Sequence, residues 1–270
     1  MFKKLFGPKV APNPKPGPQL CMPTLATTEP PSAAAITSAW KQLFPKHPPL
    51  NGADSQDQVY SFEADGMTVM VAAMPMPIPA GDIEHACELS WMWEDAAAEM
   101  KRQKSHFIIT ALHAKDMGAD PVAEAMLVSR TAAAVCKASQ AVGVYWGNGA
   151  QVHKPEFFIE AVQSFEEDDL LPCMLWVGQV VSGDSQKGPF TLSTVGLKHF
   201  GHKDIEVIDT SMHPGDLRST IYDLINYLLS NGPILKHGQT FGPSADIKWN
   251  VEHTTSQLRP GEPVIRLHIP

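Results

Sequence analysis

The sequence lacks any apolar run of about 18 residues, which is roughly the length that a transmembrane helix needs. An apolar share of 43% is still enough for a sizeable core in a chain of 270 residues. The start, Met1–Leu5, imitates the charged beginning of an export signal. Its apolar part ends at Gly7 and Pro8, short of the roughly 7–15 residues that such a signal needs. We therefore expect a cytoplasmic protein with no membrane partner.

Cysteine is scarce and widely spaced. The four cysteines contain no Cys-x-x-Cys pair, which argues against zinc ribbons and thioredoxin-like redox motifs. Free cysteine is commonly buried, so these side chains are predicted to be small apolar core residues. They are Cys21, Cys87, Cys136 and Cys173.

Short motifs for catalysis and cofactor binding are also missing. There is no Gly-x-Ser-x-Gly elbow, no Gly-Lys-Ser/Thr phosphate loop and no His-Glu-x-x-His pair. The triplet Gly147–Gly149 lacks the third glycine of a dinucleotide loop, because position 152 holds Val152, so it predicts a turn. We expect no catalytic residue and no cofactor, and the protein is predicted not to be an enzyme.

The histidines do not predict a metal site. His106 and His113 flank one expected strand with opposite side-chain parity, so they cannot easily share a metal ion. His199 and His202 are separated by Phe200-Gly201, which is typical of a turn between strands. Structural or surface roles are the expectation for all of them.

The net charge of −8 is unevenly distributed. The first twenty residues hold four lysines and no acid, so the remaining residues carry −12. An acidic body argues against a nucleic-acid partner, because phosphate contacts need a basic face. It is compatible with a basic protein partner. Simple solubility is the commoner explanation of a charge of this size.

The chain divides by composition into an arm and two halves. Residues 1–31 form a proline-rich arm, in which a short strand over 19–25 is expected. Residues 32–165 form an N-terminal α+β half, and residues 170–270 form a C-terminal α+β half. The pattern predicts a mixed, largely antiparallel sheet with helices packed on it. Two similar halves sharing one sheet are one arrangement, although their sequence similarity is too weak for a repeat.

Local signals place the elements of the N-terminal half. Asp65-Gly66 between two apolar runs predicts a hairpin of strands 59–64 and 67–74. The prolines of 75–79 must leave the sheet. Asp82 is the expected N-cap of one long helix that reaches Gln103. The other expected elements are helices 33–44, 121–139 and 155–164, a polar loop over 46–57, and strands 105–112 and 143–146.

The C-terminal half alternates strands with one helix. That helix begins at Pro214 and is stopped by Asn231-Gly232-Pro233. Its predicted apolar stripe is Leu217, Ile221, Leu224, Ile225 and Leu228. The expected strands are 171–181, 190–199, 205–209, 247–253 and 264–268.

Two features are candidates for partner contact. Glu166-Glu167-Asp168-Asp169 is predicted to be an acidic loop between the halves, for which a merely solvated loop is the alternative. Trp91 and Trp93 lie two residues apart on the expected long helix, so they point to different faces. Trp91 is the candidate exposed anchor, and core packing is its alternative.

Several segments resemble one bacterial family. They are Thr194–Glu206, the helix from Pro214, Gly238-x-Thr240-x-Gly242, Pro75–Pro79, Trp91-x-Trp93-x-Asp95-Ala96 and Gly143–Trp146. Together they are similar to the family named domain of unknown function 4261, over most of residues 20–270. Some members of that family resemble proteins encoded beside secreted antibacterial effectors, including those of type VI secretion. The resemblance therefore implies an immunity role.

The functional hypothesis is a cytoplasmic immunity protein, or antitoxin, that binds and neutralises a secreted effector. A nuclease is one candidate effector, because its basic cleft would suit an acidic inhibitor. An enzyme with an unrecognised site is the first alternative, and a pocket that joins His106, His113 or His199 to buried acids would favour it. A scaffold tethered by the proline-rich arm is another, and a homo-oligomer remains open.

Overall fold

The computed structural model describes residues 11–56, 58–113, 120–168, 170–183, 188–242, 244 and 246–270. The chain forms two compact units. The N-terminal unit is Pro16–Gly178, and the C-terminal unit is Gln179–Pro270 together with the arm up to Lys15. Each unit has its own largely antiparallel sheet, which confirms the predicted α+β class. The idea of one sheet shared by two halves is wrong. None of the described helices is long and apolar enough to cross a membrane.

The sheet of the N-terminal unit has seven strands in the order β2-β3-β4-β5-β1-β6-β7, and every pair is antiparallel. The predicted hairpin at Asp65-Gly66 is confirmed, because both residues have positive φ and Ala64 pairs with Met67. The strands are β1 (Cys21–Leu25), β2 (Asn51–Gln56), β3 (Val59–Ala64), β4 (Met67–Met74), β5 (Ser105–His113), β6 (Ala141–Trp146) and β7 (Gln151–His153).

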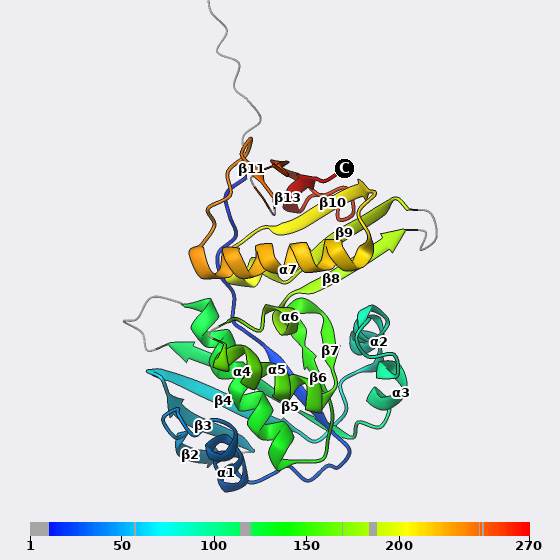
Figure 1. Cartoon of the computed structure of the whole chain (residues 1–270). Coiled ribbons are helices and arrows are strands. Elements are labelled where there is room, and N and C mark those ends of the chain that lie inside the picture. The colour runs from blue at the N-terminus through cyan, green and yellow to red at the C-terminus, as the bar shows by residue number, and fades with distance from the viewer. Residues whose placement is uncertain are drawn as a thin grey trace, which may run out of the picture. The chain divides into compact units, whose positions relative to one another are not determined.

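One face of this sheet packs against α4 (Pro121–Ala138), which contacts α1 (Ala33–Leu43) and α5 (Pro155–Glu167) as well as strands β1, β4, β5 and β6. Figure 1 shows α4 and α5 in front of these strands. The Asp120 carboxylate accepts the N–H groups of Val122 and Ala123, as expected of an N-cap before a proline. Alanines along α4 allow this close approach to the sheet. All four cysteines are buried, as predicted.

The opposite face carries α2 (Ala80–Leu89) and α3 (Ala96–Met100), which contact β7 and β6. The prediction of one long helix from Asp82 to Gln103 is therefore wrong. The break falls at Ser90, whose hydroxyl lies 2.8 Å from the Ala86 carbonyl and 3.1 Å from the Val152 carbonyl. The same hydroxyl accepts the N–H of Val152 at 3.2 Å. This tie to β7 pins the end of α2 to the sheet and turns the chain away from the helix axis.

Other element boundaries also differ from the predictions. Strand β2 lies inside the expected loop 46–57. The expected strand 171–181 begins with a short helix, α6 (Cys173–Trp176), because His153 and Gln151 bind the Leu175 and Met174 carbonyls. The expected strand 190–199 ends at Val195 and a 3-10 turn follows. The predicted turn at Gly147–Gly149 is confirmed.

The sheet of the C-terminal unit has the order β11-β12-β13-β10-β9-β8. Strands β10 and β13 are parallel, and the pairs of β10 with β9, of β12 with β13 and of β11 with β12 are antiparallel. Helix α7 (Pro214–Asn231) buries the five residues of its predicted stripe. The strands are β8 (Gly178–Gly183), β9 (Phe190–Val195), β10 (Asp204–Thr210), β11 (Thr240–Phe241), β12 (Trp249–Thr255) and β13 (Pro263–His268).

The arm residue Ala11 is held by a lysine of the C-terminal unit. Lys203 is buried, and its Nζ donates to the Ala11 carbonyl at 2.5 Å and to His253 Nδ1 at 3.0 Å. His253 Nε2 in turn donates to the Leu235 carbonyl at 2.9 Å. Burial lowers the pKa of Lys203. These bonds tie the arm and the segment after α7 to the sheet.

A buried carboxylate, Glu206 on β10, organises the middle of this sheet. Ser256 Oγ donates to it at 2.6 Å, the N–H of Gln257 at 3.2 Å, and Arg266 on β13 at 2.7 Å. Burial opposes the ionisation of Glu206, but the bonds from Ser256, Arg266 and Gln257 outweigh it, so the pKa lies below its usual value. Every oxygen of this carboxylate is occupied, which is typical of a structural role.

Asp204, two residues earlier, is buried with fewer partners. Its Oδ1 accepts from Thr194 Oγ1 at 2.9 Å and from the N–H of Leu197 at 3.2 Å, whereas Arg259 Nη2 stays 3.9 Å from Oδ2. Burial raises the pKa of Asp204 to about 6, although Thr194 and Arg259 offset part of the effect. The folded state therefore holds this proton more tightly than the unfolded chain, whose pKa is about 3.9.

We expect the Asp204 contribution to stability to be complete below about pH 3.9 and to be lost as the pH rises through about 6. The replacement Asp204→Asn keeps an acceptor for Thr194 and removes the charge. It should raise the unfolding free energy of the C-terminal unit by roughly 2–3 kcal/mol at neutral pH relative to the wild type. Amide hydrogen exchange in β10 measures this difference. Equal amide exchange rates in the wild type and the variant, both below about pH 3.9 and above about pH 6, would contradict it.

Candidate partner-binding surface

The predicted acidic loop is instead the end of a helix. Helix α5 reaches Glu167, so Glu166 and Glu167 lie in its last turn and Asp168 is its C-cap. Asp169 lies outside the described residues. The sequence predicted that this helix ends at Ser164. It continues to Glu167, and in its last turn the side chain of Glu166 contacts residues from distant segments.

Those partners neutralise Glu166. Arg130 of α4 donates to its Oε1 from Nε at 3.0 Å and from Nη2 at 2.7 Å. His47 Nε2 contacts the same oxygen, and Arg130 Nη1 also donates to Asp65 at 3.3 Å. Glu166 therefore links α5 to α4 and to His47, and Arg130 extends this contact to the hairpin turn. Only Glu167 and Asp168 of the described cluster are exposed, which weakens it as a docking patch.

A second surface is built by residues 75–104, the excursion segment, which connects β4 to β5. Between Pro77 and Pro79, the backbone of Ile78 is bonded on both sides by one side chain. Gln103 Oε1 accepts the N–H of Ile78 at 3.1 Å, and Gln103 Nε2 donates to its carbonyl at 3.2 Å. His106 Nδ1 lies 2.8 Å from the Met76 carbonyl. These contacts hold the proline-rich stretch against the end of the segment.

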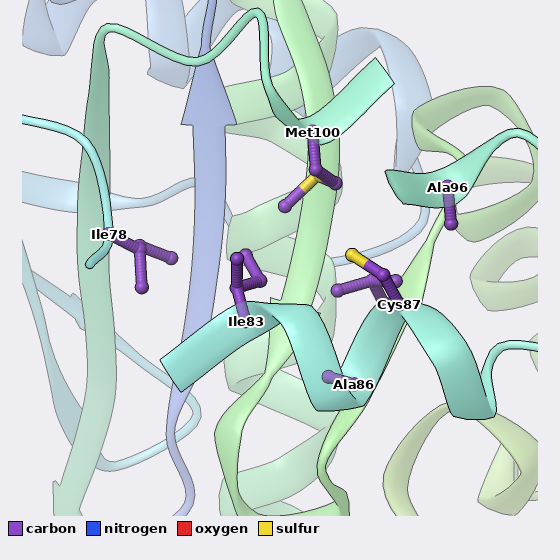
Figure 2. Packing of buried hydrophobic residues seen from close by; sticks show 7 residues of the cluster. Ile78, Ile83, Ala86, Cys87, Ala96 and Met100 are labelled. Atoms are coloured by element: carbon purple, nitrogen blue, oxygen red, sulfur yellow. The ribbon is translucent and has the colours of Figure 1, made fainter. Parts of the chain in front are cut away.

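The excursion segment encloses a cavity of about 480 Å³. In Figure 2, Ile78, Ile83 and Met100 point toward a common space between α2, α3 and the preceding proline-rich stretch. Its volume falls within the range of sites that bind small ligands or the side chains of a partner. The lining residues are Pro77, Ile78, Pro79, Ala80, Ile83, Glu84, Cys87, Glu88, Ala97, Met100, Lys101 and Gln103.

The floor of this cavity rests on the sheet. Met100 packs beside Gly143 of β6, where any Cβ would collide with the Met100 sulfur. Thr24 of β1 lies 3.6 Å from that sulfur and donates to the Gly143 carbonyl at 3.1 Å. The buried residues around the cavity form an apolar cluster of Ile78, Ile83, Ala86, Cys87, Ala96, Met100 and Val152, against which Met22, Trp93 and Tyr145 pack. The lack of a side chain at Gly143 thus allows Met100 to lie close to β6, whereas the sequence analysis predicted only that Gly143 lies in a strand.

Exposed apolar side chains gather along the excursion segment. Met76 is 54% exposed, Trp91 is 51% exposed and Met92 is 44% exposed. Trp91 lies in the connection between α2 and α3, outside the cavity, whereas Trp93 is partly buried against the cluster. The expectation that the two tryptophans face different surroundings is met, although they do not share a helix. Exposed aromatic and Met side chains are enriched where proteins bind partners.

The charge around this surface is mainly negative. Residues 47–100 contain no Lys or Arg, whereas ten Asp and Glu side chains fall in this stretch. The N-terminal unit holds nine basic and twenty acidic residues, a net charge of −11, and the C-terminal unit carries +3. The rim acids Glu84 and Glu88 are exposed, and Lys101 is the one base among the described lining residues. The surface is therefore apolar at its centre and mainly acidic at its edge.

The Cys87 thiol at the cavity wall is not an activated nucleophile. Burial raises the pKa of Cys87, and the charges of Glu84 and Glu88 raise it further. A thiol of this kind stays protonated at neutral pH and acts as a small apolar side chain.

The histidines are the first candidates for an enzyme site. Among the described residues, no three His, Cys, Asp or Glu side chains form a group that could hold a metal ion. His106 is buried against the Met76 carbonyl, and burial lowers its pKa. His113 differs, because its Nε2 lies 3.3 Å from the buried Glu124 carboxylate and accepts the Asp120 N–H at 3.1 Å. Burial raises the pKa of Glu124, and His113 partly opposes this.

Charge reversal of the acidic cluster is expected to affect stability at one position only. The change Glu166→Lys places a second cation beside Arg130, so it should lower the unfolding free energy by roughly 1–3 kcal/mol. The matched change Glu167→Lys, on the exposed side of the same turn, should stay within about 0.5 kcal/mol. Urea denaturation of both variants measures the difference. Equal unfolding free energies of the two variants would show that the contacts between Arg130 and Glu166 do not contribute to stability.

Comparison with known proteins gives one match. Residues 193–268 match the family model described as Domain of unknown function (DUF4261). No curated protein and no solved structure matches the chain. The matched stretch runs from β9 to the end of β13 and includes the buried carboxylates Asp204 and Glu206. The similarity to this family is therefore shown for residues 193–268 of the C-terminal unit.

Proposed function

We propose that this chain is a cytoplasmic immunity protein that binds a toxic effector protein and blocks it. The observation that carries the proposal is the excursion segment, which presents exposed Met and Trp side chains and an apolar cavity within an acidic unit. Inhibitory proteins bind through apolar anchors surrounded by charges that complement the target. Parts of the sequence resemble the family named domain of unknown function 4261, some members of which resemble proteins encoded beside type VI secretion effectors, and this is consistent with the same role.

The charge of the N-terminal unit favours a basic protein as the target. A net charge of −11 repels nucleic acid and attracts a basic surface over distances near the Debye length of about 8–10 Å. A nuclease fits this requirement, because the cleft that binds its nucleic-acid substrate must be basic. The acids would speed the encounter, and burial of Trp91 and Met92 would slow dissociation.

An enzyme is the second candidate, and the His113–Glu124 pair is the observation that favours it. A histidine 3.3 Å from a buried carboxylate is an arrangement that general acid–base catalysis uses. Neither residue lines the cavity between α2 and α3. Because Asp120 N–H occupies the same ring nitrogen, the pair also has a structural role at the start of α4. The pair supports this candidate less directly than the excursion segment supports partner binding.

The proposed function is tested by capture followed by co-expression. The full chain is used as bait in lysate of its own host, and each captured protein is then produced alone and together with the chain. We expect one partner that arrests growth when alone and is harmless when the chain is present. Capture of a harmless partner would favour a scaffold or adaptor. No growth arrest by any partner, with no rescue on co-expression, would refute the immunity role.

Association kinetics with the captured effector test the acidic edge. The double change Glu84→Lys and Glu88→Lys should lower the association rate by about tenfold at low salt and reduce its salt dependence. The control is Glu29→Lys with Glu160→Lys, which changes net charge equally at exposed sites elsewhere in the same unit. Surface plasmon resonance gives both rates. Equal slowing by the two double variants would assign the effect to net charge rather than to this edge.

A further inference from the structure

We propose that the cavity between α2 and α3 is an anchor site for one bulky apolar side chain of a partner polypeptide, in a segment where Lys or Arg residues flank it. This inference rests on the proposed function, because it names the chemistry by which the effector docks. The ligand class of the cavity can also be tested by itself, without the effector.

The walls of the cavity specify an apolar group. Ile78, Ile83, Cys87 and Met100 line it, and each of these side chains is itself almost fully buried. The remaining space of about 480 Å³ is therefore bounded by a packed layer and is not the gap left by loose side chains. An aromatic or branched side chain that enters it exchanges water contact for contact with these four groups.

The surroundings of the cavity specify basic flanks. Glu84 and Glu88 stand one helical turn apart on α2 and are exposed at its edge. Asp82 adds another exposed acid on α2, whereas Glu99 on α3 is paired with Arg102. Lys101 lies on the rim, and Arg102 and Lys104 follow it, so the excursion segment holds six acids and three bases. Between Lys46 and Lys101 the sequence contains no Lys or Arg. A flanking acid on the ligand would meet this edge as a like charge.

The entrance is held open by the backbone of the excursion segment. The two bonds between Gln103 and Ile78 fix the proline-rich wall against the end of the segment. The Ser90 bonds to β7 fix the end of α2. Pro77 and Pro79 limit the collapse of that wall, because their φ angles are fixed. A site with preformed walls loses little entropy when the ligand side chain enters.

The probe is a fluorescein-labelled peptide, Lys-Lys-Leu-Phe-Lys-Lys, added to the full chain labelled at its methionine methyl groups. We expect the Met100 methyl resonance to shift on titration, while that of Met67, which is buried in β4 and does not line the cavity, stays in place. Replacing Leu-Phe by Ala-Ala should weaken binding by at least about tenfold, as loss of a large apolar contact requires. Replacing the lysines by glutamates should weaken it by a similar factor.

Two variants of the protein complete the test. The change Ala97→Trp fills the mouth of the cavity and should abolish the Met100 shift, whereas Ala98→Trp is the matched control on the same helix and should leave it. An unchanged Met67 resonance verifies that both variants fold. Equal binding of the Leu-Phe and Ala-Ala peptides would overturn the anchor site, as would an unaltered Met100 shift in Ala97→Trp. Rescue of growth by the Ala97→Trp variant would overturn the site and leave the immunity role intact.

Discussion

The prolines at 75, 77 and 79 impose the constraint on which the candidate surface depends. They cannot continue the ladder of β4, so the strand ends at Met74 and the chain leaves the sheet. It must return to the same place, because Met74 pairs with His106 at the start of β5. The whole excursion segment is therefore folded back over the neighbouring strands β1, β6 and β7. Two short helices, a bonded proline-rich wall and a cavity between them are the result.

The two units differ in charge, and this separates their roles. The N-terminal unit is strongly acidic and carries the exposed Met and Trp side chains. The C-terminal unit carries the family match, and two of its buried charged residues have internal partners: Glu206 is bonded to Arg266, and Lys203 is bonded to the Ala11 carbonyl of the arm. The buried network around Glu206 accounts for a fold signature. We therefore propose partner binding on the N-terminal unit, outside the matched residues.

Local patterns predicted the parts of the fold that local physics decides. Asp65-Gly66 specified its hairpin, Asp120 capped α4, and the stripe of α7 faced the core. The failures share a cause, which is a bond to a distant segment. Ser90 ended α2 through Val152, and Glu166 was neutralised by Arg130 and His47. The cavity depends on Gln103 reaching back to Ile78, which no spacing in the sequence indicates.

The central claim is that a partner protein docks on the excursion segment. Hydrogen exchange of the full chain, with and without the captured effector, tests it most directly because it maps the contact without mutation. The account predicts that the effector slows exchange at the amides of α2, α3 and their connection, while β12 and β13 of the C-terminal unit exchange as before. Slowed exchange confined to the C-terminal unit, with α2 and α3 unchanged, would contradict it.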